Sequence, residues 1–121
     1  MLFNLEKNEI DYMIHQEKYD VWKAKLSDND YDAIIAELHK IMDEKDIINS
    51  SFIPGSDWTG KVYEPIYYAC GENEDNAKLF YGLLVWEATQ LHSENWMFIK
   101  TEDNPDKPSG TTYFKRKDKD S

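Results

Sequence analysis

The stretch NEDNAKLFYGLLVWEATQLHSE, residues 73–94, decides the fold of this chain. Its apolar residues recur every three or four positions, and a second apolar stripe leaves residues 79–86 without a charge. A helix that is apolar on nearly all sides must be covered from several directions. Asn73 suits its N-cap, and His92 falls in its last turn. We therefore expect a central buried helix whose main stripe is Ala77, Phe80, Tyr81, Leu84, Val85, Ala88 and Leu91.

Helical patterns also precede this stretch. Asn8 is a plausible cap for a first helix, whose apolar stripe slips in phase around residues 15–18, so one long helix or two short ones fit. The polar run SDND at 27–30 predicts the start of a second, amphipathic helix. The apolar side of that helix holds Tyr31, Ile34, Ile35, Leu38, Ile41 and Met42. His39 lies off this stripe, and we expect it in solvent.

The C-terminal part reads as a β-hairpin. Residues 95–101, NWMFIKT, and 110–116, GTTYFKR, are rich in aromatic and β-branched residues and flank a polar segment. Because a lone hairpin is marginal in water, it must pack on the helices or pair with a third strand, at 47–48 or 52–53. Pro65 and Gly71 predict the start and the end of a short helix before the central one.

The predicted fold class is therefore α+β, with N-terminal helices and a central buried helix packed against a C-terminal antiparallel hairpin or small sheet. We expect residues 1–116 to form a single domain and residues 117–121 to be a frayed tail. The chain has 121 residues, and its 40% hydrophobic content suffices for a core. No apolar run approaches the roughly 18–20 residues that cross a bilayer. We therefore expect no membrane segment. With a single cysteine, Cys70, no disulfide can form within the chain, which favours a cytoplasmic protein.

The sequence offers few residues for catalysis. His15, His39 and His92 stand in separate predicted elements without a metal-ligand spacing, and we expect no metal and no cofactor. Cys70 lies on an apolar face where a thiolate is disfavoured, so a nucleophilic pair of Cys70 and His92 has little support. We therefore expect no enzymatic activity.

Charge is the strongest pointer to function. The net charge is −10, and residues 1–104 hold 21 acids and 9 bases, whereas residues 105–121 hold 3 acids and 5 bases. Such a body repels nucleic acid directly and is steered toward a basic protein partner. We predict a binding face with Asp20, Glu37 and Glu44 around Trp22, although Trp22 fits the inner stripe equally well. In size and acidity the chain is compatible with an inhibitor or immunity-type protein for a basic nucleic-acid-handling enzyme. Acidity that only confers solubility, or a structural role in an assembly, stays open.

An alternative function involves the segment at 54–60. It places the large aromatic Trp58 between two hydrogen-bonding residues, Asp57 and Thr59, in a long connection of the kind that is often functional. A small-ligand or enzymatic pocket between this loop and the central helix is the second hypothesis. Trp58 closing the core, with Asp57 tied into the turn, is the simpler interpretation of the same residues.

Overall fold

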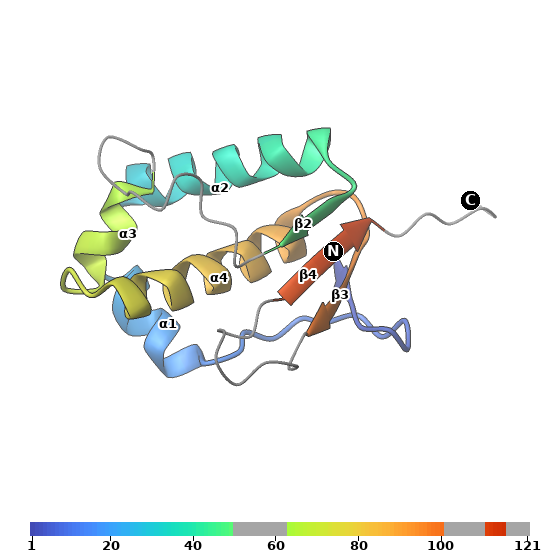
Figure 1. Ribbon diagram of the computed structural model, residues 1–121, viewed down its shortest axis with the longest axis horizontal. Coiled ribbons are helices and arrows are strands. Elements are labelled where there is room, and N and C mark those ends of the chain that lie inside the picture. Colours follow the sequence, from blue (N-terminus) through green and yellow to red (C-terminus); the bar gives the residue numbers. More distant parts are fainter. Residues whose placement is uncertain (50–62, 101–110, 116–121) are drawn as a thin grey trace.

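A computed structural model of the chain describes residues 1–49, 63–100 and 111–115 (Figure 1). Within them, four helices and a mixed four-stranded sheet form an α+β fold, as predicted. The elements in chain order are β1 (Leu2–Phe3), α1 (Gln16–Lys23), α2 (Asp28–Glu44), β2 (Ile47–Asn49), α3 (Glu64–Ala69), α4 (Glu74–Leu91), β3 (Trp96–Lys100) and β4 (Thr111–Lys115).

The predicted central helix is α4. Figure 1 shows it running through the middle of the molecule, with α2 above it, α1 below it and the strands beside its C-terminal half. Nine of its residues are buried, and the Asn73 side chain caps it by accepting a hydrogen bond from the Asn76 N–H at 3.0 Å. Leu91, which we expected on the buried stripe, is instead 57% exposed, although the neighbouring His92 is buried.

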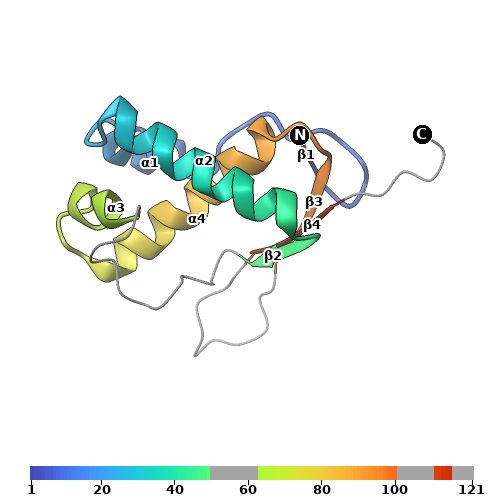
Figure 2. The same cartoon turned by 90° about the horizontal axis from the view of Figure 1, so that it is seen from above.

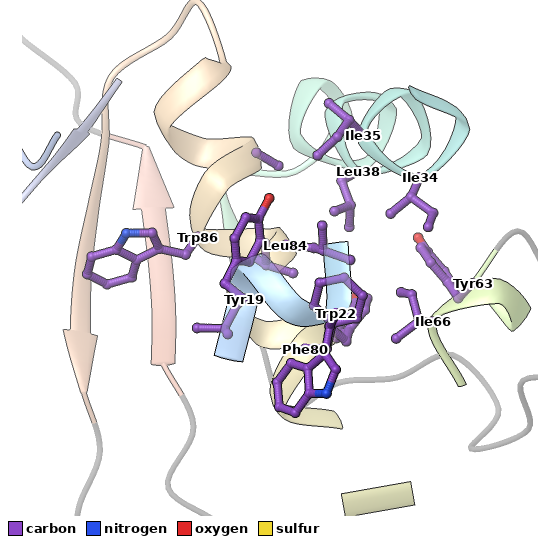
Figure 3. Packing of buried hydrophobic residues seen from close by; sticks show 14 of the residues in the cluster. Tyr19, Trp22, Ile34, Ile35, Leu38, Tyr63, Ile66, Phe80, Leu84 and Trp86 are labelled. Atoms are coloured by element: carbon purple, nitrogen blue, oxygen red, sulfur yellow. The ribbon is translucent and has the colours of Figure 1, made fainter. Parts of the chain in front are cut away.

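The core surrounds α4. Figure 3 shows the side chains that reach it from the other helices: Tyr19 and Trp22 of α1, Ile34, Ile35 and Leu38 of α2, Ile66 of α3 and the neighbouring Tyr63. Trp86 points the other way, toward the strands, where its ring meets that of Phe98 at a centroid distance of 4.9 Å. The central helix therefore packs on helices with one side and on the sheet with the other.

The strand order is β1-β3-β4-β2. β3 and β4 form the predicted antiparallel hairpin, in which Trp96 lies opposite Lys115 and Phe98 opposite Tyr113. β2, at the first of the two predicted positions, supplies the third strand and pairs antiparallel with β4, so Ile48 lies opposite Tyr113. The helices lie on one side of this sheet (Figure 2). Residues 52–53, the other predicted position, lie outside the described residues.

The N-terminal segment differs from the prediction of a helix capped by Asn8. Residues 2–3 form β1, which pairs in parallel with β3, and the Asn4 side chain then accepts hydrogen bonds from the N–H groups of Glu6 and Asn8. The Asn8 carbonyl oxygen, which a helix cap would offer to the first helical hydrogen bond, instead accepts from the Asn4 N–H at 3.0 Å, so no helix starts there. The helix begins only after His15, whose φ of 51° is left-handed, and Val21 is 56% exposed.

The second helix is confirmed. Ser27 caps α2 by accepting a hydrogen bond from the Asp30 N–H at 3.1 Å, and Ile34, Ile35, Leu38 and Met42 are its buried residues. Gly71, with a φ of 68°, follows α3 in the left-handed conformation that glycine adopts most readily. The start of α2 and the end of α3 could be predicted from the sequence, because capping residues and glycine act through local backbone geometry.

Candidate functional site

The acidic charge of the described residues is concentrated on one helix. α2 holds six carboxylates and a single lysine in 17 residues, whereas the 18 residues of α4 hold three carboxylates and one lysine. Asp28 and Asp30 lie in the first turn of α2, where the positive end of the helix dipole stabilises them. The remaining carboxylates are Asp32, Glu37, Asp43 and Glu44, and all except the half-buried Glu37 are exposed.

The last turn of α2 is electrostatically unfavourable. It ends with Asp43 and Glu44 and contains no basic residue, although the negative end of a helix dipole favours cations. Asp43 has a hydrogen-bond partner on another element, since its Oδ1 lies 2.8 Å from His92 Nε2. For Glu44, the described residues supply no ion pair. The negative charge of Glu44 therefore lowers the stability of α2.

The predicted partner-binding residues are separated by the fold. Glu37 and Glu44 lie two turns apart on α2, whereas Asp20 lies on α1, on the other side of α4 in Figure 1, where it accepts a hydrogen bond from Gln16. Trp22 is only 9% exposed and its ring lies 5.6 Å from that of Phe80. The inner-stripe interpretation of Trp22 is thus the right one, and we remove it from the partner surface.

Glu37 faces the junction between α2 and α3. The pKa of Tyr63 is raised, mainly because the side chain is buried and to a smaller extent because Tyr81 and Glu37 lie nearby. The Tyr63 hydroxyl is buried and, among the described residues, has no hydrogen-bond partner. Glu37 therefore acts partly on the interior of the fold. Beyond the first turn of α2, Asp32 and Glu44 are exposed acids for which the described residues supply no ion pair.

Two histidines that are far apart in sequence meet where α2 and α4 approach the sheet. The rings of His39 and His92 are 5.1 Å apart, edge to face. The expectation of a solvated His39 is wrong: it is half-buried, and its Nε2 lies 3.0 Å from the carbonyl oxygen of Ala88, so it donates there. His92 is 4% exposed. Helical periodicity could not show this contact, because it depends on how two helices pack.

Hydrogen bonds fix the tautomer of His92. Its Nδ1 accepts from the Glu94 N–H at 3.1 Å and from the indole N–H of Trp96 at 3.2 Å. Because both neighbours can only donate, Nδ1 carries no proton and Nε2–H donates to Asp43. The ring thereby ties the end of α4 to α2 and to β3.

Asp43, His92 and Glu94 offer atoms within 4.8 Å of one another, a spacing that could hold a metal ion. The hydrogen bonds do not fit this use. A ligating histidine normally donates its second ring N–H to an acceptor, whereas Nδ1 of His92 faces two donors. Glu94 is also engaged, since its Oε1 lies 3.5 Å from Lys115 Nζ. The arrangement is suited to joining elements and not to binding a cation.

The remaining reactive groups lie apart or are buried. Cys70 is 6% exposed, and burial raises the pKa of its thiol to about 11, which agrees with the predicted inert cysteine. It follows α3 near the N-terminus of α4, while His92 follows the C-terminus of the same 18-residue helix, about 27 Å away at 1.5 Å per residue. The pair of Cys70 and His92 is thereby excluded.

One carboxyl group lies inside the helical layer. Glu87 of α4 accepts a hydrogen bond from the Tyr19 hydroxyl and lies 3.9 Å from Lys23 Nζ, and burial raises the pKa of its carboxyl. The same Lys23 Nζ lies 4.4 Å from the centre of the Tyr31 ring. These contacts hold α1 against α4 and α2. The second set of predicted site residues, Asp57, Trp58 and Thr59, lies outside the described residues.

Comparisons of the chain with protein-family models, with curated proteins and with solved structures gave no match. In the described part of the chain, none of the helices combines the length and the hydropathy needed to cross a bilayer.

Proposed function

We propose that this protein is a non-enzymatic binding protein that uses the acidic helix α2 to engage a basic protein partner. The observation that carries the proposal is the last turn of α2, where Asp43 and Glu44 oppose the helix dipole and no residue of that turn is basic. A fold under selection for stability alone would gain from a lysine at position 44. An acidic group kept there at a cost is consistent with a role outside the fold.

The partner class follows from the charge. A net charge of −10 disfavours direct contact with nucleic acid and accelerates encounter with a positively charged protein surface. Enzymes that handle nucleic acids carry such surfaces, because they must bind phosphates. An inhibitor or immunity-type protein acting in the cytoplasm on such an enzyme is the function that we infer.

The proposal is tested by capturing partners from the native host with the wild-type chain and with a double variant, Asp32→Lys with Glu44→Lys. A basic protein that the wild type retains and the variant loses is the expected partner. Its association with the wild type should slow at least tenfold between low and physiological salt, because screening shortens the range of steering to about 8–10 Å. Salt-independent association would contradict the proposal.

A matched control separates the position of the charge from its amount. Glu17→Lys changes the net charge by the same two units as Glu44→Lys, but it lies on α1 and is also exposed. We expect Glu44→Lys to slow association several-fold more than Glu17→Lys. Equal effects would mean that only total charge matters and that α2 is not the contact surface.

A further inference from the structure

The strand β2 forms one end of the sheet, and its outer edge faces away from β4. The Lys115 N–H donates to the carbonyl oxygen of Asp46 at 2.8 Å. Bonded and non-bonded pairs alternate along an antiparallel ladder, so Ile48 also directs its backbone groups to β4, whereas Ile47 directs its N–H and C=O outward. Among the described residues, no strand pairs with this outer edge. Ile47 therefore presents a donor and an acceptor to an incoming strand.

An apolar row leads across the sheet to this edge. Phe3 lies opposite Met97, Met97 opposite Phe114, and Phe114 opposite Ile47, so the four side chains share one face. This is the face turned away from the helices, since the alternate residues, such as Trp96, are buried against them. Three residues of the row are half-buried, but Ile47 is 63% exposed. An apolar side chain of an added strand could continue the row beyond Ile47.

The charge beside this edge is negative. The segment that leads from α2 into β2 holds three carboxylates and one lysine: Asp43, Glu44, Asp46 and Lys45. A second lysine, Lys115, lies 3.9 Å from Asp46. A strand with basic residues is attracted to this end of β2, and an acidic strand is repelled. The backbone geometry thus favours an added strand, and the charge favours a strand with basic side chains.

We propose that the outer edge of β2 binds an extended basic segment of the partner, which adds a fifth strand to the sheet. Its backbone pairs with that of Ile47, one apolar side chain continues the row, and its lysines or arginines meet the carboxylates at the end of α2. Backbone pairing at a sheet edge supplies affinity, and alternate side chains supply selectivity. This inference rests on the proposed function and names the form in which the basic partner is recognised.

The probe is an acetylated, amidated eight-residue peptide that alternates lysine and isoleucine, measured by fluorescence anisotropy with the full chain. Ile47→Pro removes the outward N–H, and proline is tolerated at an edge strand where the N–H faces solvent. We expect it to weaken peptide binding at least tenfold. The matched control, Ile47→Thr, keeps the N–H and the β-branched shape, and we expect a change below threefold. In the wild type, the Ile47 amide should become protected from hydrogen exchange on binding.

Two further peptides keep the test decisive if Ile47→Pro fails to fold. A peptide with N-methyl groups on alternate residues cannot donate along its edge, and its loss of binding to the wild type supports strand addition. A peptide with glutamate in place of lysine should not bind. Equal binding of either peptide would overturn the inference.

The outcomes separate this inference from the proposed function. If Glu44→Lys weakens binding of the captured partner while Ile47→Pro leaves it unchanged, the acidic face stands and the strand-addition inference fails. Sedimentation of the wild type tests for a second copy at this edge. A dimer that Ile47→Pro dissociates would overturn the basic peptide as occupant.

Discussion

Helices α2 and α4 have nearly equal lengths, 17 and 18 residues, but opposite compositions. α4 has nine buried residues and is covered by three helices and the sheet, while α2 has four buried residues and carries six carboxylates. Burial in the fold explains the apolar composition of α4. It leaves part of α2 unexplained, namely the exposed acids that oppose the helix dipole. We therefore infer that the binding surface lies on α2.

The largest expected effect belongs to α4. Leu84 is fully buried, and Leu84→Ala should lower the free energy of unfolding by about 2–5 kcal/mol, because truncation removes apolar contact and leaves a cavity. Leu91→Ala on the same helix is the control, since Leu91 is 57% exposed, and surface changes stay within about 0.5 kcal/mol. Denaturant melts give both values. Similar losses for the two variants would refute the assigned burial of α4.

The histidine junction joins the two helices and should rank second. His92→Ala removes the acceptor of the buried Trp96 indole N–H and the bond to Asp43, and should cost about 2–4 kcal/mol. Trp96→Phe removes one hydrogen bond and also leaves a gap at a fully buried position, so it should cost about 1–3 kcal/mol. Chemical denaturation measures both losses. If His92→Ala were neutral, the junction would not connect α2 to α4 as described.

A third prediction concerns pH and the one carboxyl that α4 buries. Because burial raises the pKa of Glu87, the folded chain holds this proton more tightly than the unfolded chain. The resulting stabilisation is present below the ordinary glutamate pKa of about 4.3 and is lost as pH rises through the folded value. Glu87→Gln mimics the protonated form, so its stability relative to wild type should increase with pH over this range. Thermal melts across pH test this, and a decrease would contradict the assigned burial.

Much of the fold could be predicted because it depends on local rules. Periodicity identified α2 and α4, Ser27 and Asn73 cap them as capping residues do, and alternation identified β3 and β4. β1 was missed because two residues carry no periodic signal, and its strand exists only through pairing with β3. We placed the start of the first helix at Asn8, but it begins after His15. The turn at Asn4 and the left-handed backbone of His15 delay the helix, and apolar periodicity does not show either of them.

The candidate site was less accessible to prediction. The acidity of α2 could be predicted from the sequence, but which of its acids face solvent depends on packing. Glu37 is half-buried and Glu44 is exposed. Packing also places Trp22 in the core. The approach of His39 to His92 is a tertiary contact. The outward direction of the Ile47 backbone follows from the register with β4, which alternation alone does not fix.

The smallest expected change in stability tests the central claim, that α2 keeps acids for a partner at the expense of the helix. Glu44→Lys places a cation at the negative end of the helix and should raise the free energy of unfolding by about 0.3–1 kcal/mol. Glu17→Lys, in the first turn of α1, should lower it by a similar amount, about 0.3–1 kcal/mol.

The decisive measurement pairs a denaturant melt of Glu44→Lys with its rate of association to the captured basic partner. We predict a more stable protein that binds more slowly. A variant that is less stable than wild type, or that associates at the wild-type rate, would contradict the account.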